Sequence, residues 1–231
     1  DLFGKTKDAF QLFNQTYQQA LLPEKVTFLN MLLACTTEKV DLYVGKRLHA
    51  LCVFSEFIYE SSVGTAVISM YGKCGAIVEA EHVFRRISHH DTVSWNAMLS
   101  AYVEQSQAEK ALRSYLQMVG EAVNPDQLTY IVSAQACSIL ADTEEAVLEE
   151  GQSLKEVPLE IGRALHSEAR RKGFLSNEFL GSTLVSMYGK CGMVQEAEHV
   201  FSIMSPHHHN VVSWNAMLSV YVDDHKAKEA L

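Results

Sequence analysis

Residues 69–75 read SMYGKCG, and residues 186–192 repeat the same seven letters. The likeness extends beyond them, because residues 64–84 and 181–201 are identical at 14 of 21 positions. Repetition on this scale predicts a stack of similar supersecondary units, each packed on its neighbours, rather than one closed core.

A second repeated motif, VSWNAMLS, occupies residues 93–100 and 212–219. Around its first copy, apolar residues fall at helical spacing twice between residues 92 and 126, with a polar stretch between the two runs. Gly120 and Pro125 then end the second run. Each unit is therefore predicted to be a pair of antiparallel helices, and the fold class to be all-α, an α-solenoid or superhelix of helix-turn-helix repeats.

Extending the two motifs outward divides the chain into consecutive units. Residues 26–35 align with 128–137, and GKRLH at 45–49 aligns with GRALH at 162–166. The predicted units are a partial one at 1–24, complete ones at 25–60, 61–91, 92–126, 127–177 and 178–210, and a partial one at 211–231.

The unit 127–177 is longer than its counterpart because of an acidic insertion of 15 residues near 142–158. Within it LEEGQSL resembles LEIGRAL eleven positions later, which indicates either a local duplication or a gene-model artefact. Gly151 and Pro158 are expected to interrupt any continuous helix, leaving an acidic bulge or an extra short helix.

Composition excludes several functional classes. The chain has 231 residues, 48% of them hydrophobic, and a formal net charge of −9. No stretch approaches the roughly 18 consecutive apolar residues of a membrane span, and no targeting signal is evident at the N-terminus, so no membrane partner is expected. The acidic balance argues against a generic polyanion binder, although the acidic insertion accounts for much of it.

The candidate catalytic and metal-binding residues are better explained by structural roles in packing, turns and loops. The five cysteines lack zinc-type spacing and are expected to be small buried hydrophobes, with Cys74 and Cys191 at turns rather than reactive thiols. His166 opens an H-x-E triplet typical of a zinc deaminase, but the matching P-C-x-x-C is missing, which favours a packing histidine equivalent to His49. The three histidines at 207–209 indicate a solvated loop. No catalytic residue, metal, cofactor or small-molecule substrate is therefore expected.

Unit lengths of 35, 36 and 31 residues, together with VSWNAMLSAY, a Thr-aromatic-x6-Cys pattern ending in LH, and GTAVISMYGKCG with EAEHVF, resemble plant pentatricopeptide repeat proteins of the PLS class. The resemblance covers the whole chain and labels 1–24, 92–126 and 211–231 as P-type, 25–60 and 127–177 as L-type, and 61–91 and 178–210 as S-type. It implies sequence-specific binding of single-stranded RNA, one base per repeat, in a mitochondrion or chloroplast. The expected role is to specify C-to-U editing sites together with editing-complex proteins, with any deaminase domain outside this chain.

In that family the fifth and last residues of a P- or S-type repeat select the base, and the second residue stacks on it. The resemblance therefore implies base-reading roles for Thr65 with Asp91, Asn96 with Asp126, Ser182 with Asn210, and Asn215, and stacking roles for Val93 and Val212. These pairs are similar to guanine, uracil and adenine readers, in that order. The L-type pairs, Leu29 with Glu60 and Ile131 with Asn177, match no base reader.

Two alternatives stand beside this interpretation. Asp91, Asp126, Asn177 and Asn210 each precede a predicted helix, where Asp and Asn are favoured N-caps for backbone reasons alone. Helical-hairpin solenoids also bind peptides, so a protein–protein scaffold is the alternative function. Trp95 and Trp214 can stack bases, but their place one residue before the reading position favours burial between helices.

Overall fold

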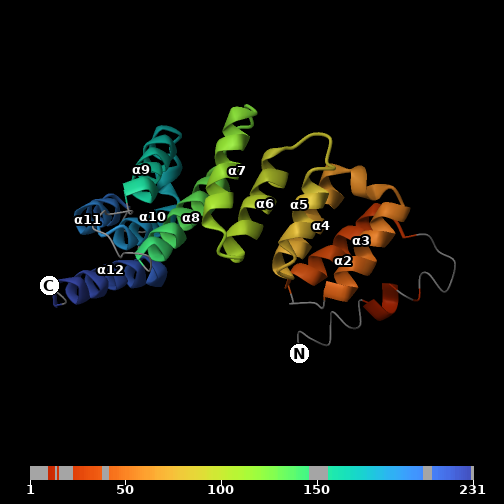
Figure 1. Ribbon diagram of the computed structural model, residues 1–231, viewed down its shortest axis with the longest axis horizontal. Coiled ribbons are helices and arrows are strands. Elements are labelled where there is room, and N and C mark those ends of the chain that lie inside the picture. The colour runs from red at the N-terminus through yellow and green to blue at the C-terminus, as the bar shows by residue number, and fades with distance from the viewer. Residues whose placement is uncertain are drawn as a thin grey trace. The chain divides into compact units, whose positions relative to one another are not determined.

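The computed structural model describes residues 10–13, 15, 23–37, 42–145, 156–204 and 210–229 (Figure 1). Every regular element in these ranges is a helix and none is a strand, which confirms the predicted all-α class. The α-helices are α2 (Lys25–Thr37), α3 (Leu42–Phe54), α4 (Ser61–Lys73), α5 (Ile77–Phe84), α6 (Thr92–Glu104), α7 (Ala108–Gly120), α8 (Gln127–Glu145), α9 (Glu156–Arg171), α10 (Glu178–Lys190), α11 (Val194–Ile203) and α12 (Val211–Glu229). Two single 3-10 turns, Phe57–Tyr59 and Phe174–Ser176, precede α4 and α10.

The helices form two compact units. The first holds residues up to Gln105 together with Gly120–Val123, and the second holds the remainder. In the first unit α4 packs between α2 and α6, and in the second α10 packs between α8 and α12. We call these six helices the first helices, because each opens one of the predicted repeats. The second helices α3, α5, α9 and α11 pack beside them as hairpin partners.

The SMYGKCG motif ends α4 and α10 with the same turn. Gly75 has φ +73° and Gly192 has φ +75°, a left-handed conformation that glycine adopts without the cost a side chain would add. The amide of Gly75 donates to the carbonyl of Gly72 at 3.0 Å and the next amide donates to Tyr71 at 2.9 Å. The second copy repeats both bonds, at 2.9 and 2.8 Å. This pattern is a Schellman motif, which satisfies the last carbonyls of each helix.

The rest of the motif packs against the neighbouring first helix. Met70 and Tyr71 are fully buried, as are Met187 and Tyr188. A Cβ added to Gly72 would lie 2.7 Å from the Cβ of Ala101 in α6, so a larger residue would force α4 and α6 apart. The heptapeptide is thus a structural motif that reverses the chain and permits close helix contact.

The two tryptophans of the repeated octapeptide differ. Trp95 is 1% exposed, as the sequence predicts. Its ring lies edge-on to those of Phe84 and His90, with centroid distances of 4.8 and 5.5 Å. Trp214 is 54% exposed, so the prediction of burial is wrong for this residue. The centroid of its ring lies 4.9 Å from that of Phe201. The described helices that pack on α12 are α10 and α11.

The described ends of the acidic insertion belong to helices. α8 has 19 residues where α2 has 13, and α9 begins at Glu156. Pro158 lies in the first turn of α9, where a missing N–H breaks no helical hydrogen bond. Gly151 and the three histidines at 207–209 lie outside the described residues.

Candidate nucleic-acid interface

The second residue of the first helices forms a repeated apolar surface. This residue is apolar in five of the six first helices, and each of the five side chains is between 48% and 63% exposed: Val26, Val93, Leu128, Phe179 and Val212. Val93 and Val212 were predicted from the sequence and Val26, Leu128 and Phe179 were not, although all five hold the same register in their units. Ser62 is the exception in α4 and is also exposed. Exposed apolar groups at one per repeat are suited to flat ligands such as nucleobases.

The fifth residue of each complete S- or P-type unit is buried rather than exposed. Thr65, Asn96 and Ser182 are 9% exposed or less. Thr65 lies on α4, which packs against α6, and Ser182 lies on α10, which packs against α12. Asn96 lies on α6, which packs against α4 and α5 in the first unit. In the last first helix the equivalent Asn215 is exposed.

The buried hydroxyls of Thr65 and Ser182 have different environments. Ser182 donates its hydroxyl hydrogen to the carbonyl of Glu178 at 2.8 Å within its own helix. The Thr65 hydroxyl has no hydrogen-bond partner among the described residues. An unpaired buried hydroxyl costs about 1–3 kcal/mol, and a ligand able to bond it would recover part of that.

In four units the side chain of the last residue caps the next first helix, whereas that of Glu60, before α4, makes no capping hydrogen bond. The Asp91 carboxylate accepts from the Ser94 amide at 2.8 Å, and Asp126 accepts from Thr129 at 2.9 Å. Asn177 and Asn210 accept in the same way, from Leu180 at 2.9 Å and Ser213 at 3.0 Å. All four therefore have the N-cap role that the alternative interpretation predicts.

Asp91 also contacts the helix that carries its predicted partner. Its second carboxylate oxygen accepts a 3.1 Å hydrogen bond from the hydroxyl of Ser61. Ser61 lies one turn before Thr65, so both residues are on the same face of α4. The fold thus brings the last and fifth positions of unit 61–91 to one region, although no direct bond joins them.

Asp91 is ionised in this setting. Partial burial acts to raise the pKa of its carboxyl group, but hydrogen bonds from Ser94 and Ser61 outweigh burial and hold the pKa below its ordinary value. An ionised carboxylate only accepts hydrogen bonds, whereas the amide of Asn210 both donates and accepts. The two capping residues can therefore discriminate between different base edges.

The other predicted pairs are placed as follows. Ser182 and Asn210 both belong to the second compact unit, on α10 and at the N-cap of α12. Asn96 belongs to the first compact unit and Asp126 belongs to the second. In the L-type units, Leu29 and Ile131 are half-buried and apolar, and Glu60 forms an ion pair with Lys25.

Most cations near these helices are neutralised by carboxylates. Lys73 pairs with Glu104, and Lys190 lies 3.3 Å from Asp142 and 3.8 Å from Asp223. Lys46 and Arg163 pair with Glu79 and Glu196 at 2.8 Å. The positive charge near these helices is therefore largely offset by neighbouring carboxylates.

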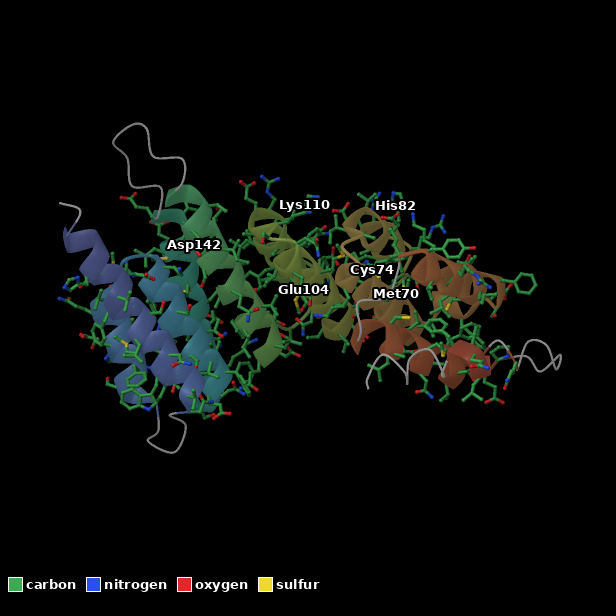
Figure 2. The ribbon with its side chains drawn as sticks, turned by 90° about the horizontal axis from the view of Figure 1, so that it is seen from below. Met70, Cys74, His82, Glu104, Lys110 and Asp142 are labelled. Atoms are coloured by element: carbon green, nitrogen blue, oxygen red, sulfur yellow. The ribbon has the colours of Figure 1, made fainter. Side chains whose placement is uncertain are left out.

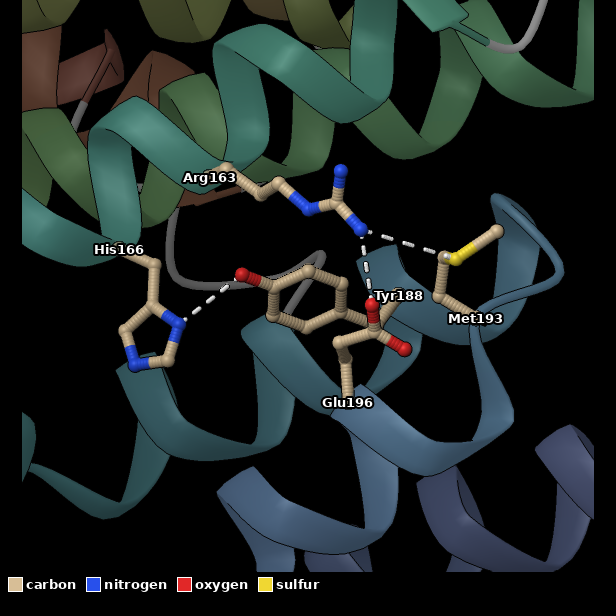
Figure 3. Close-up of polar contacts among 5 residues, drawn as sticks. All are labelled: Arg163, His166, Tyr188, Met193 and Glu196. Carbon is tan, nitrogen blue, oxygen red and sulfur yellow. Dashed lines mark hydrogen bonds and ion pairs between the residues drawn. The ribbon is translucent and has the colours of Figure 1, made fainter.

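The histidines of the LH motifs pack on tyrosines. Figure 3 shows the Nδ1 atom of His166 in α9 joined to the hydroxyl of Tyr188 in α10, at 3.0 Å. His49 and Tyr71 repeat this bond at 2.9 Å. Burial lowers the pKa of both histidines, with nearby arginines adding to the effect, so both rings are neutral at pH 7. Two equivalent His–Tyr bonds agree with the predicted packing role of His166.

The cysteines and acidic groups add no reactive centre within the described ranges. No disulfide joins any of the five cysteines, and burial raises the pKa of Cys35, Cys52 and Cys137 to about 12. In the described part of the chain no group of three or more His, Cys, Asp or Glu residues is placed to hold a metal ion. A membrane-spanning helix is likewise not found among the described helices.

Comparison with known families identifies the repeats. The PPR repeat model matches residues 65–91, 182–205 and 212–231, and the PPR repeat family model matches residues 90–138. These matches include both copies of each repeated motif and cover just over half of the chain. The chain belongs to the pentatricopeptide repeat family.

Curated pentatricopeptide repeat proteins of Arabidopsis thaliana align along nearly the whole chain. A chloroplastic member is 33% identical over 99% of this chain and 34% of its own length, and a second chloroplastic member is 32% identical over 99% of this chain and 26% of its own length. A mitochondrial member is 30% identical over 99% of this chain and 25% of its own length. The chain thus spans only a third or less of these pentatricopeptide repeat relatives.

Solved structures show the same fold. The crystal structure of the pentatricopeptide repeat protein PPR10 in complex with an 18-nucleotide psaJ RNA element matches 97% of this chain and 41% of that protein, with a TM-score of 0.53 and 16% sequence identity. At this identity the likeness supports the α-solenoid architecture of pentatricopeptide repeats and not the details of a binding site.

Proposed function

We propose that this chain binds single-stranded RNA in a sequence-specific manner, with one nucleotide at each repeat. The observation that carries the proposal is the repeated surface of the first helices, where an exposed apolar second residue recurs beside a polar capping residue. A base inserted between two apolar second residues, such as Phe179 and Val212, would have an apolar wall on each face, and a base beside Ser62 would have one such wall. The capping residue would meet the edge of the base. The RNA-bound PPR10 structure shows that this fold can accommodate RNA, which supports the proposal.

We infer the bases from the resemblance to the PLS class. The alternating unit lengths favour this class, and within it Thr65 with Asp91 would select guanine, Asn96 with Asp126 uracil, and Ser182 with Asn210 adenine. The L-type unit 127–177 would leave one base unread between uracil and adenine. With the chain running along RNA from 5′ to 3′, the preferred sequence is GUNA.

Burial of the fifth residues sets a condition on binding. Buried Thr65 and Ser182 lie on first helices that pack against the next first helix of the same unit, so a base edge reaches them only if these helices separate slightly. The unpaired hydroxyl of Thr65 would gain a hydrogen bond in that event. We therefore expect RNA binding to be coupled to a small rearrangement between α4 and α6.

The biological role follows from the relatives. Their chloroplastic and mitochondrial names support action in an organelle, and resemblance to the PLS class favours the selection of C-to-U editing sites with other editing-complex proteins. The repeats would supply recognition, and a deaminase elsewhere would supply the chemistry.

A gel-shift titration with short single-stranded RNAs tests this function. RNA containing GUNA should bind more tightly than RNA in which G, U or A is replaced, and replacing N should have little effect. Equal losses at all four positions would contradict the proposal.

A protein-binding scaffold is the competing function, and the net charge of −9 and the paired cations favour it. Salt dependence separates the two. Affinity for RNA should fall steeply as salt rises, because phosphate contacts release counterions, whereas an apolar peptide groove should respond little.

A further inference from the structure

A cavity between the second helices α3 and α5 is distinct from the interface above. It has a volume of about 340 Å³ and is lined by His49 from α3 and by Glu79, His82, Val83, Arg85 and Arg86 from α5 and the residues after it. Figure 2 shows His82 at the margin of this unit, away from Met70 and Cys74 on α4. Cavities of about 300–1,000 Å³ are typical of small-molecule sites.

The cavity carries an excess of positive charge. The backbone amide of Arg86 donates to the carbonyl of Val83 at 3.0 Å, but its exposed guanidinium forms no ion pair or hydrogen bond with a described residue. Arg85 donates from Nε to the carbonyl of Glu81, and its Nη2 lies 3.8 Å from the Glu81 carboxylate, so its outer nitrogens keep free donors. Glu79 is the carboxylate among the lining residues, and Lys46 neutralises it at 2.8 Å. Two guanidinium groups at one opening are suited to an oxyanion, which accepts their paired N–H donors.

His49 adds a neutral polar group to the same wall. Its Nδ1 atom is bonded to Tyr71, and its Nε2 atom is buried with no hydrogen-bond partner among the described residues. Because the ring is neutral, the attraction for an anion comes from the arginines, and the histidine contributes polarity only.

The second half of the chain has residues equivalent to those that line this cavity, but without the two arginines. Residues 117 positions later are His166, Glu196, His199, Val200, Ser202 and Ile203. Figure 3 shows that the surrounding contacts are kept, because Arg163 holds Glu196 at 2.8 Å as Lys46 holds Glu79, and His166 bonds Tyr188. Ser202 and Ile203 replace Arg85 and Arg86, so the equivalent residues of the second half lack these two cations, while Arg170 acts on His166 there.

We propose that the cavity between α3 and α5 binds a small oxyanion of the phosphate class, inorganic phosphate or a phosphomonoester, through Arg85 and Arg86. The equivalent position between α9 and α11 does not bind it. This site is separate from RNA recognition, since its residues come from second helices and the base-reading residues come from first helices and their caps.

Nuclear magnetic resonance titration of the isotope-labelled chain with inorganic phosphate tests the proposal. Arginine side-chain signals of Arg85 and Arg86 and the imidazole signals of His49 should shift and saturate, while those of Arg163 and His166 stay in place. Acetate at equal concentration should bind more weakly. Equal shifts at His49 and His166, or equal affinity for acetate, would overturn the proposal.

Matched variants sharpen the test. Arg85→Ser with Arg86→Ile copies the second site into the first and should weaken phosphate binding by roughly tenfold to a hundredfold, the effect of losing charge-assisted hydrogen bonds. Both side chains are exposed, so this variant should fold. Ser202→Arg with Ile203→Arg should create phosphate-dependent shifts at His166. Unchanged affinity in the first variant would overturn the proposal.

A comparison of phosphate sources completes the design. A small phosphomonoester should compete with inorganic phosphate at His49. Binding of GUNA-containing RNA should be the same in the chain and in the Arg85→Ser, Arg86→Ile variant. A parallel loss of RNA affinity would show that the arginines contact the RNA backbone and would overturn a small-molecule site.

Discussion

Helices α6 and α12 carry the same octapeptide and present it to different surroundings. In α6, Trp95 and Leu99 are fully buried, whereas in α12 their counterparts Trp214 and Leu218 are more than half exposed. Both helices begin with a capping residue and an exposed valine, so their first turns are equivalent. The comparison teaches that local sequence sets the helix and its cap, while the neighbouring helices set burial.

The largest expected contrast is between the two tryptophans. Trp95→Ala should lower the free energy of unfolding by about 3–5 kcal/mol, as for other buried aromatic residues. Trp214→Ala should cost about 1 kcal/mol or less, because much of its ring is already in water. Urea unfolding followed by circular dichroism measures both, and equal losses would contradict the difference in burial.

Substitution of the two turn glycines should lower the free energy of unfolding by less than Trp95→Ala does, and by the same amount in both copies. Gly75→Ala and Gly192→Ala each force a side chain into the left-handed region, at a cost of about 1–2 kcal/mol. Because this is a backbone cost, the two copies should match within experimental error, unlike the tryptophans. The same urea titrations give the result, and a large difference would show that packing, not backbone strain, dominates at one turn.

The smallest contrast concerns pH. Burial lowers the pKa of His49 and His166 below the ordinary value of 6.5, and Arg86 near the first ring and Arg170 and His199 near the second act in the same direction. Below that pH the unfolded chain binds protons that the folded chain does not, so stability should fall as pH drops through 6.5.

Replacing the two histidines should flatten this pH dependence. His49→Gln and His166→Gln each remove one titrating ring. Each substitution should therefore remove a similar part of the loss of stability between pH 7.5 and 5.5, measured as the shift of the urea midpoint. As controls, Tyr71→Phe and Tyr188→Phe remove the hydrogen bond but not the titration, so they should lower stability and keep the pH dependence. An unchanged slope in the glutamine double variant would contradict the assignment.

Much of the fold could be predicted from the sequence. The repeated motifs predicted an all-α fold of helical hairpins, and the turn glycines of SMYGKCG have the left-handed conformation that such a turn needs. The N-cap role of Asp91, Asp126, Asn177 and Asn210 could also be predicted, since it depends on the backbone alone.

What could not be predicted depends on neighbours. Identical octapeptides gave no signal that Trp214 would be exposed, because its cover comes from other helices. Burial of Thr65 and Ser182 has the same origin, since each lies on a first helix that packs against the next first helix of the same unit. The exposed Val26, Leu128 and Phe179 were not predicted, although they hold the register of Val93 in their units.

The central claim is that Asp91 and Asn210 read bases as well as cap helices, and their exchange tests it most directly. Asp91→Asn and Asn210→Asp keep good N-caps, so urea midpoints should not change. Gel shifts with RNAs varied at the G and A positions should then show that Asp91→Asn moves the preference at the first position from guanine to adenine, and that Asn210→Asp moves the last from adenine to guanine, each by roughly tenfold. Unchanged base preference in both variants would mean that these residues only cap helices, and would contradict the account.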